Sequence, residues 1–141
     1  MRSIPAFCCL LLLCSCRQNH PALQLSTFRE VPKEINAGSF FAQNGSDLEK
    51  GNYLFVQDYD SVAFVFINDK LVRMRLSACI IDSVANTMDE TYEQNDLTVK
   101  LNAKYVNDAG DKEHDFEGRI TVKNSKGDSV AKNVVGYDLV E

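Results

Sequence analysis

The chain has 141 residues, of which 45% are hydrophobic and 25% are charged, and its formal net charge is −5. This length is typical of one globular domain with its own hydrophobic core, and the acidic balance argues against nucleic acids and anionic lipid headgroups as electrostatic partners. A net negative charge that serves only to keep the protein soluble explains this balance equally well.

Residues 1–15 have the layout of a secretory signal peptide: Arg2, an apolar run over residues 4–13, and small Ser15 directly before Cys16. Ten apolar residues at about 1.5 Å each are too short to cross a bilayer core of about 30 Å. We therefore expect this segment to be removed. Its removal takes away one base and no acid, so the net charge of −5 becomes −6.

The stretch Leu13-Cys14-Ser15-Cys16 resembles the lipobox of bacterial lipoproteins. The resemblance implies a lipid on the Cys16 sulfur and, after cleavage, an acyl chain such as palmitate on its α-amino group. Several acyl chains, at about 0.8 kcal/mol per buried CH2, make membrane anchoring stable. Arg17 stands where inner-membrane lipoproteins carry Asp, so the resemblance implies the outer membrane, facing the periplasm or the exterior. The alternatives are an ordinary signal peptide or a buried apolar hairpin.

Cysteine usage agrees with export, because four of the five cysteines lie in or at the end of this segment. Only Cys79 remains once Cys16 is lipidated, so we expect no intrachain disulfide. Its neighbours Ile80 and Ile81 predict that Cys79 is a buried small hydrophobic residue.

The rest of the chain divides into an expected lipid-anchored tether over 16–36 and a single β domain over 37–141. Within the tether, residues 23–35 contain Pro32 and alternate poorly, so they are either a frayed edge strand or more tether.

Strand patterns begin after residue 37. A first short strand is expected over 38–43, and the turn residues at 44–47 end it. Residues 53–56 and 62–67 are apolar runs rich in aromatic and β-branched side chains, as in strands covered on both faces.

Asn68-Asp69-Lys70 supplies residues that tolerate positive φ, which predicts a tight hairpin. The return strand alternates, with Arg73 and Arg75 expected to face outward. The residues expected to face inward are Val72, Met74 and Leu76.

Residues 77–90 place apolar side chains at helical spacing between strand-like neighbours, so we expect a loop or short helix leading into a strand. Residues 90–93 can then pair across 94–96 with a long alternating strand over 97–105. Further strands are expected over 116–123 and 129–137. About seven or eight short strands predict an all-β fold, a small antiparallel β-sandwich or open barrel.

Several segments together resemble small exported bacterial lipoproteins of largely unassigned role. They are Gly51-Asn52-Tyr53-Leu54-Phe55-Val56, Ala63 to Lys70, Gly118 to Lys123, Lys126-Gly127 and Gly136-Tyr137. In outline the domain is also similar to the small β-barrel periplasmic inhibitors of lysozyme. The Ser-Gly-x-x-Tyr signature of those inhibitors does not occur here, so the resemblance assigns no inhibitory residue.

Signatures of catalysis are scarce in this sequence. After the signal peptide the histidines are His20, in the tether, and His114, in a loop, so neither a zinc site nor a histidine-based triad is expected. The remaining metal hypothesis is Ca²⁺ on acidic turns, because flexible carboxylates suit this ion. Its candidates are Asp58 with Asp60, or the loop residues Asp108, Asp111, Glu113 and Asp115.

Two functions remain. The first is a non-catalytic, membrane-anchored binding or structural module of the cell envelope, without a cofactor other than its lipid. Its candidate partner contacts, chosen near turns or on outward faces, are Tyr59, Arg73, Arg75 and Tyr92. The second is an inhibitor of a cationic secreted hydrolase such as lysozyme, which an acidic surface would attract.

Overall fold

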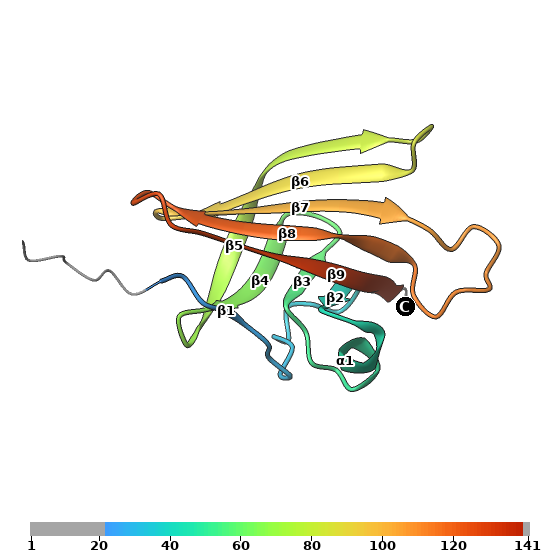
Figure 1. Cartoon of the computed structure of the whole chain (residues 1–141), viewed down its shortest axis with the longest axis horizontal. Helices are drawn as coiled ribbons and strands as arrows, with labels where there is room; N and C mark the ends of the chain where they lie inside the picture. Colours follow the sequence, from blue (N-terminus) through green and yellow to red (C-terminus); the bar gives the residue numbers. More distant parts are fainter. Residues whose placement is uncertain (1–21, 140–141) are drawn as a thin grey trace, which may run out of the picture.

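The structure, a computed structural model, describes residues 22–139 and consists mainly of β-strands (Figure 1). The predicted signal peptide, Cys16 and His20 lie outside the described residues. In chain order the elements are β1 (Leu25–Ser26), β2 (Gly38–Ala42), α1 (Gly45–Glu49), β3 (Phe55–Asp58), β4 (Val62–Ile67), β5 (Lys70–Asp82), β6 (Thr87–Gln94), β7 (Leu97–Tyr105), β8 (Phe116–Asn124) and β9 (Ser129–Leu139). Within residues 22–139, no helix is both long and apolar enough to span a membrane.

Strands β2 to β9 form an up-and-down barrel in which each strand pairs antiparallel with its neighbours in sequence. The ring closes where β2 pairs with β9, with Gly38 opposite Leu139. The extra strand β1 pairs with β4, with Leu25 opposite Ile67. The predicted all-β antiparallel fold is confirmed, in the form of a closed barrel with one added strand.

The hairpin turns use residues that take positive φ at low cost. Between β4 and β5, Asn68 and Asp69 have φ values of 49° and 63°. Asn95 has a φ of 52° in the β6–β7 turn, and Gly127 has a φ of 89° in the β8–β9 turn. The hairpins predicted at these places are confirmed.

Alternate side chains of the strands fill the barrel interior, as the sequence predicts for β7 and β8. The largest fully buried ones include Phe41, Phe55, Leu54, Met74, Leu101, Ile120 and Val122. An eight-stranded barrel has an interior just wide enough for such filling, and each buried side chain of this size stabilises the fold by about 1.5–3 kcal/mol. Much of the barrel is therefore a packed core.

A second core lies on the outside of the barrel. Phe40, Val56 and Phe64 are cross-strand partners that point away from the interior. Residues 23–35, here called the strap, cover them with Phe28 and Ile35, which are 8% and 7% exposed. The strap thus contains a short edge strand, and the folded part begins well before residue 37.

The expectation of a loop or short helix over residues 77–90 is wrong. β5 continues to Asp82, the chain turns over residues 83–86, and β6 returns from Thr87, with Ile80 opposite Asp89. The apolar side chains at helical spacing are distributed over both faces and the tip of this hairpin, so they do not form one helical stripe.

The two ends of the barrel differ. The closed end carries the turns at 68–69, 95–96 and 125–127 and is plugged by Leu23 and Leu25 of the strap. The opposite end, here called the mouth, carries the β3–β4 turn, the β5–β6 turn, the β7–β8 loop and the C-terminal end of β9. In Figure 1 the β5–β6 hairpin extends past the shorter strands at the mouth, and the first described residues lie at the other end.

Candidate functional site

The mouth of the barrel opens into a cavity of about 210 Å³. It exists because β4 pairs with β5 only from Lys70 to Arg75, after which a bulge at Leu76 and Ala78 turns β5 away from β4. The cavity's polar lining residues are Ser39, Gln57, Asp58, Tyr59, Asp60, Glu90 and Asp138. Its apolar lining residues are Leu76, Cys79, Ile81, Met88 and Phe116.

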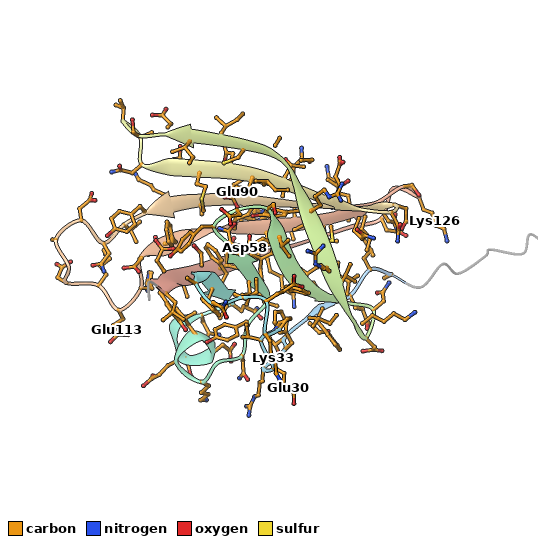
Figure 2. All side chains as sticks on the ribbon, turned by 180° about the vertical axis from the view of Figure 1, so that it is seen from behind. Glu30, Lys33, Asp58, Glu90, Glu113 and Lys126 are labelled. Carbon is orange, nitrogen blue, oxygen red and sulfur yellow. The ribbon has the colours of Figure 1, made fainter. Side chains whose placement is uncertain are left out.

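Carboxylates dominate the charge of this cavity. Asp58 is the last residue of β3, Asp60 lies in the β3–β4 turn, Glu90 comes from β6 and Asp138 from β9. Figure 2 shows Glu90 and Asp58 near each other, on two different strands, at the centre of the molecule. Among the residues that the structure describes, no lysine, arginine or histidine lines the cavity.

Glu90 belongs to a buried hydrogen-bonded group at the base of the cavity. It is 8% exposed, and its Oε2 lies 2.8 Å from the Tyr92 hydroxyl, which also contacts the Gln57 side-chain oxygen. Because a phenol has one proton and the Gln57 oxygen can only accept, both contacts are hydrogen bonds together only when Glu90 is protonated and donates to the Tyr92 oxygen. The three side chains thus hold one another in place.

Burial raises the pKa of Glu90 above the usual range of a glutamate, and hydrogen bonds from Tyr92 and Gln57 offset part of this rise. Burial, followed by the neighbouring Glu90, also raises the pKa of Tyr92, so the phenol stays neutral. The base of the cavity therefore holds a carboxyl group that lacks a compensating cation.

A second carboxyl group is fixed on the β2–β9 seam. The Ser39 hydroxyl donates to Asp138 Oδ1, and the Asp138 backbone N–H donates to Asp115 Oδ2 at 3.1 Å. Burial is the main cause that raises the pKa of Asp138; the charge of Asp115 adds to it and the Ser39 hydrogen bond opposes it. Two strands and the β7–β8 loop thus position this group.

One wall of the cavity is an overhanging hairpin, here called the wing, which comprises residues 77–90. It exposes Ile80 and Ile81, at 68% and 70%, and Val84 at its tip, at 94%. Cys79 and Ile81 line the cavity, whereas Ile80, their neighbour along the strand, faces the other way. The wing therefore places apolar surface directly beside the carboxylates.

The expectation of a buried Cys79 is wrong, because β5 carries this residue beyond the end of β4 and leaves it exposed. Partial desolvation and the charge of Glu90 raise the pKa of its thiol. A raised thiol pKa lowers the thiolate fraction, which gives no support to a nucleophilic role.

The structure does not bring the four predicted partner contacts together. Tyr59 is 55% exposed at the mouth, where its hydroxyl donates to the Leu139 carbonyl at 3.3 Å. Arg73 and Arg75 are exposed on the outer side of β5, and Arg73 contacts Glu34 of the strap at 3.1 Å. The expectation of an exposed Tyr92 is wrong: it is 1% exposed, because the β6 register directs it into the barrel.

Of the calcium candidates in the β7–β8 loop, Asp115 is held by hydrogen bonds within the protein, and Asp108 accepts from the Asn86 amide at 3.5 Å. Asp115 accepts from the Asn107 amide at 2.9 Å and from the Asp138 backbone, and His114 lies 3.1 Å from Glu117. Figure 2 shows Glu113 out on the loop, away from Glu90. In the part of the chain that the structure describes, no three His, Cys, Asp or Glu residues form a group that could hold a metal ion.

Asp58, the other calcium candidate, is also engaged. Its Oδ1 accepts from the backbone N–H groups of Asp60, Ser61 and Val62 at 3.1, 2.8 and 2.9 Å. This carboxylate shapes the β3–β4 turn and presents its negative charge to the mouth.

Sequence reasoning missed the centre of the site, which is Gln57, Glu90, Ser39 and Asp138. One signal for Gln57 was available, since it directly follows the apolar run 53–56. Another was the alternation of Met88, Glu90 and Tyr92, which puts a carboxylate on the same strand face as two apolar side chains. Comparison with protein-family models, with curated proteins and with solved structures finds no match to this chain.

Proposed function

We propose that this protein is a lipid-anchored binding protein of the bacterial cell envelope whose barrel mouth binds a cationic, partly apolar partner. One observation carries the proposal: the mouth cavity is lined by four carboxylates, with no basic side chain among its described lining residues, next to the exposed apolar wing. We propose a binding role rather than a catalytic one, without a cofactor other than the lipid.

Electrostatics explain why a cation would be preferred. Glu90 is desolvated and its pKa is raised, so its ionised form is costly in the free protein. A positive group that enters the cavity stabilises that ionised form by Coulomb attraction, which is stronger there than in bulk water. Neutral apolar atoms of the partner can cover Ile81 and remove its surface from water.

The position of the first described residues supports an anchored orientation. Gln24, close to the first described residue, exchanges hydrogen bonds with Asn68 in the β4–β5 turn, at 2.9 and 3.0 Å. This turn lies at the closed end, so a lipid on Cys16 would leave the mouth directed away from the membrane. By the lipobox resemblance we propose the outer membrane as its location, with the domain in the periplasm or on the cell surface.

A direct test uses two probes with the same alkyl chain and opposite charge, octylammonium and octanoate. Calorimetric titration of the protein without its first sixteen residues, which retains every described residue, should detect only octylammonium. Glu90→Gln should weaken binding about tenfold, whereas Glu93→Gln, an exposed acid on the same strand, should change it less than twofold. Equal binding of octanoate, or no effect of Glu90→Gln, would contradict a cationic ligand.

The anchor is tested separately. In the native host, mass spectrometry of the purified protein should find a mature N-terminus at a triacylated Cys16, and Cys16→Ser should abolish the lipid. An unmodified chain that still carries residues 1–15 contradicts the lipoprotein assignment.

The second candidate is an inhibitor of a cationic secreted hydrolase, and the same acidic mouth favours it because a lysine or arginine of the hydrolase could enter the cavity. An excess of the soluble protein should then slow cell-wall hydrolysis by a lysozyme, and 0.5 M salt should relieve the inhibition because it screens the attraction. Unchanged lysozyme activity at low salt rejects this function and leaves the small-cation test unaffected.

A further inference from the structure

The wing leaves the main chain of one strand without a partner on one side. The Leu76 N–H of β5 donates to the carbonyl of Ser61, the residue directly before β4, at 2.8 Å. This is the last backbone hydrogen bond on this side of β5. Beyond it lie Ser77, the bulge residue, and Ala78–Asp82, which pair with β6 alone within the described residues. At about 3.3 Å per residue, this gives a free strand edge roughly 20 Å long.

This edge lacks the usual protection against pairing. Natural edge strands are shielded by lysine, proline or inward-pointing charges, or are very short. Residues 77–82 contain neither lysine nor proline, and their one charged residue is Asp82 at the far end. Ile80 and Ile81 expose apolar surface on both faces of the strand. Such an edge is suited to accept an added strand.

The position of the edge determines what an added strand would meet. A strand beside Ser77–Asp82 would continue the line of β4, above the β3–β4 turn region that contains Asp58 and Asp60. Its inward side chains would lie next to Ile81 and the mouth carboxylates, and its outward side chains next to Ile80. Basic residues therefore fit the inward positions, and apolar residues fit the outward ones.

We propose that the free edge of β5 binds an extended peptide with alternating basic and apolar residues, which adds a strand to the barrel and directs its basic side chains into the mouth. This rests on the proposed cation-binding function and names its partner class. Charge complementarity selects such a peptide over a second copy of this chain, because a second copy would bring Asp82 and another acidic mouth to the same edge.

The test uses a fluorescent peptide of four Lys-Val repeats and the protein that begins at residue 17. Fluorescence anisotropy should show saturable binding, and amide hydrogen exchange of residues 77–82 should slow on binding because their free backbone groups become paired. A peptide of the same sequence, N-methylated at alternate residues, keeps its charge but loses one edge of strand hydrogen bonds. It should bind at least tenfold more weakly, as should a Glu-Val repeat peptide.

Two protein variants separate local binding at the edge and mouth from general charge attraction, whereas the N-methylated peptide reports strand pairing itself. Ile81→Lys places a cation on the edge, and because Ile81 is 70% exposed the fold should persist; peptide affinity should fall at least tenfold. Val84→Lys makes the same charge change at the tip, off the edge, and should alter affinity less than threefold. Equal losses in both variants would mean that charge alone drives binding and would overturn strand addition.

The remaining outcomes separate this inference from the proposed function. If octylammonium binds but neither Lys-Val peptide does, the edge inference fails and cation binding at the mouth stands. If both peptides bind equally and Glu90→Gln weakens both, the mouth binds the side chains without strand pairing. If ultracentrifugation without peptide finds a dimer that Ile81→Lys dissociates, the edge belongs to a second copy and the peptide proposal is wrong.

Discussion

The barrel wall and the wing are made from the same kind of strand, yet their isoleucines meet opposite environments. Ile120 on β8 is 0% exposed, whereas Ile81 on β5 is 70% exposed, although both point to the inner side of their strand. The difference lies in the neighbouring strands. β8 is paired on both sides and Ile120 packs within the interior cluster, whereas β4 extends only as far as Arg75 and leaves Ile81 without a strand on that side. Burial in this barrel therefore depends on the length of the neighbouring strand.

This unevenness also creates the site. β2, β3 and β4 have 5, 4 and 6 residues, while β5 has 13 and β9 has 11. At the mouth, the short β4 leaves the end of β5 projecting as an apolar wall on one side, with the carboxylates of the β3–β4 turn region on the other. Four predictions test this contrast between the packed wall and the open mouth.

Truncation of an interior residue should have the largest effect. Leu101→Ala removes a side chain that is 0% exposed and should lower the free energy of unfolding by about 2–5 kcal/mol. Ile81→Ala on the wing should change it by no more than about 0.5 kcal/mol. Urea denaturation of both variants measures the contrast, and comparable losses would mean that something covers the wing.

Removal of the buried hydroxyl should have the next largest effect. Tyr92→Phe leaves Gln57 and Glu90 without their shared partner and should cost about 1–3 kcal/mol of unfolding free energy. Tyr59→Phe, which deletes an exposed hydroxyl with one long hydrogen bond, is the matched control and should be close to neutral. Equal stabilities of the two variants would show that the group at the cavity base contributes no stability.

The pH dependence of Glu90 should be a smaller effect with a defined sign. Burial raises its folded-state pKa above the usual glutamate value of 4.5, so the stability it contributes is complete below that value and is lost as pH rises through the folded pKa. Glu90→Gln cannot ionise. The Tm of this variant minus the Tm of the native protein should therefore increase as pH rises from 4 to 7. Thermal unfolding of both proteins at several pH values measures this difference. A constant difference would contradict a raised pKa.

The exposed ion pair of the strap should matter least. Arg73 and Glu34 have side chains 55% and 45% exposed, so Arg73→Ala should cost less than about 1 kcal/mol. Arg75→Ala, on the same outer side of β5, is the control. The difference in unfolding free energy between the two variants should shrink in 0.5 M salt, because salt screens the ion pair. A loss above about 2 kcal/mol in Arg73→Ala would contradict a weak, exposed ion pair.

Local sequence patterns predict much of the strand and turn structure of the barrel wall, but little of the burial and side-chain contacts at the mouth. The alternation of β7 and β8 and the Asn68-Asp69 turn are properties of neighbouring residues, so the sequence alone predicts them. Burial at the mouth depends on where β4 ends relative to β5, which no local pattern contains. For this reason the exposure of Cys79 is missed. Tyr92 is misplaced for another reason: its position near the 94–96 turn suggests exposure, whereas the β6 register directs it into the barrel.

The site residues illustrate the same limit. Ser39 and Asp138 are 99 positions apart and meet only because β2 and β9 close the ring. Glu90 and Gln57 meet across the barrel interior, so neither residue indicates its partner in the sequence.

The seam between β2 and β9 also determines when the protein can become complete. Its pairing joins the first strand of the barrel to the last, so the ring cannot form until the C-terminal strand has been synthesised and has reached the others. Contacts between residues this distant in sequence slow folding, because the chain loses entropy before they form. Until then Gly38–Ala42 lacks its β9 partner, and this free strand edge is open to pairing with another chain.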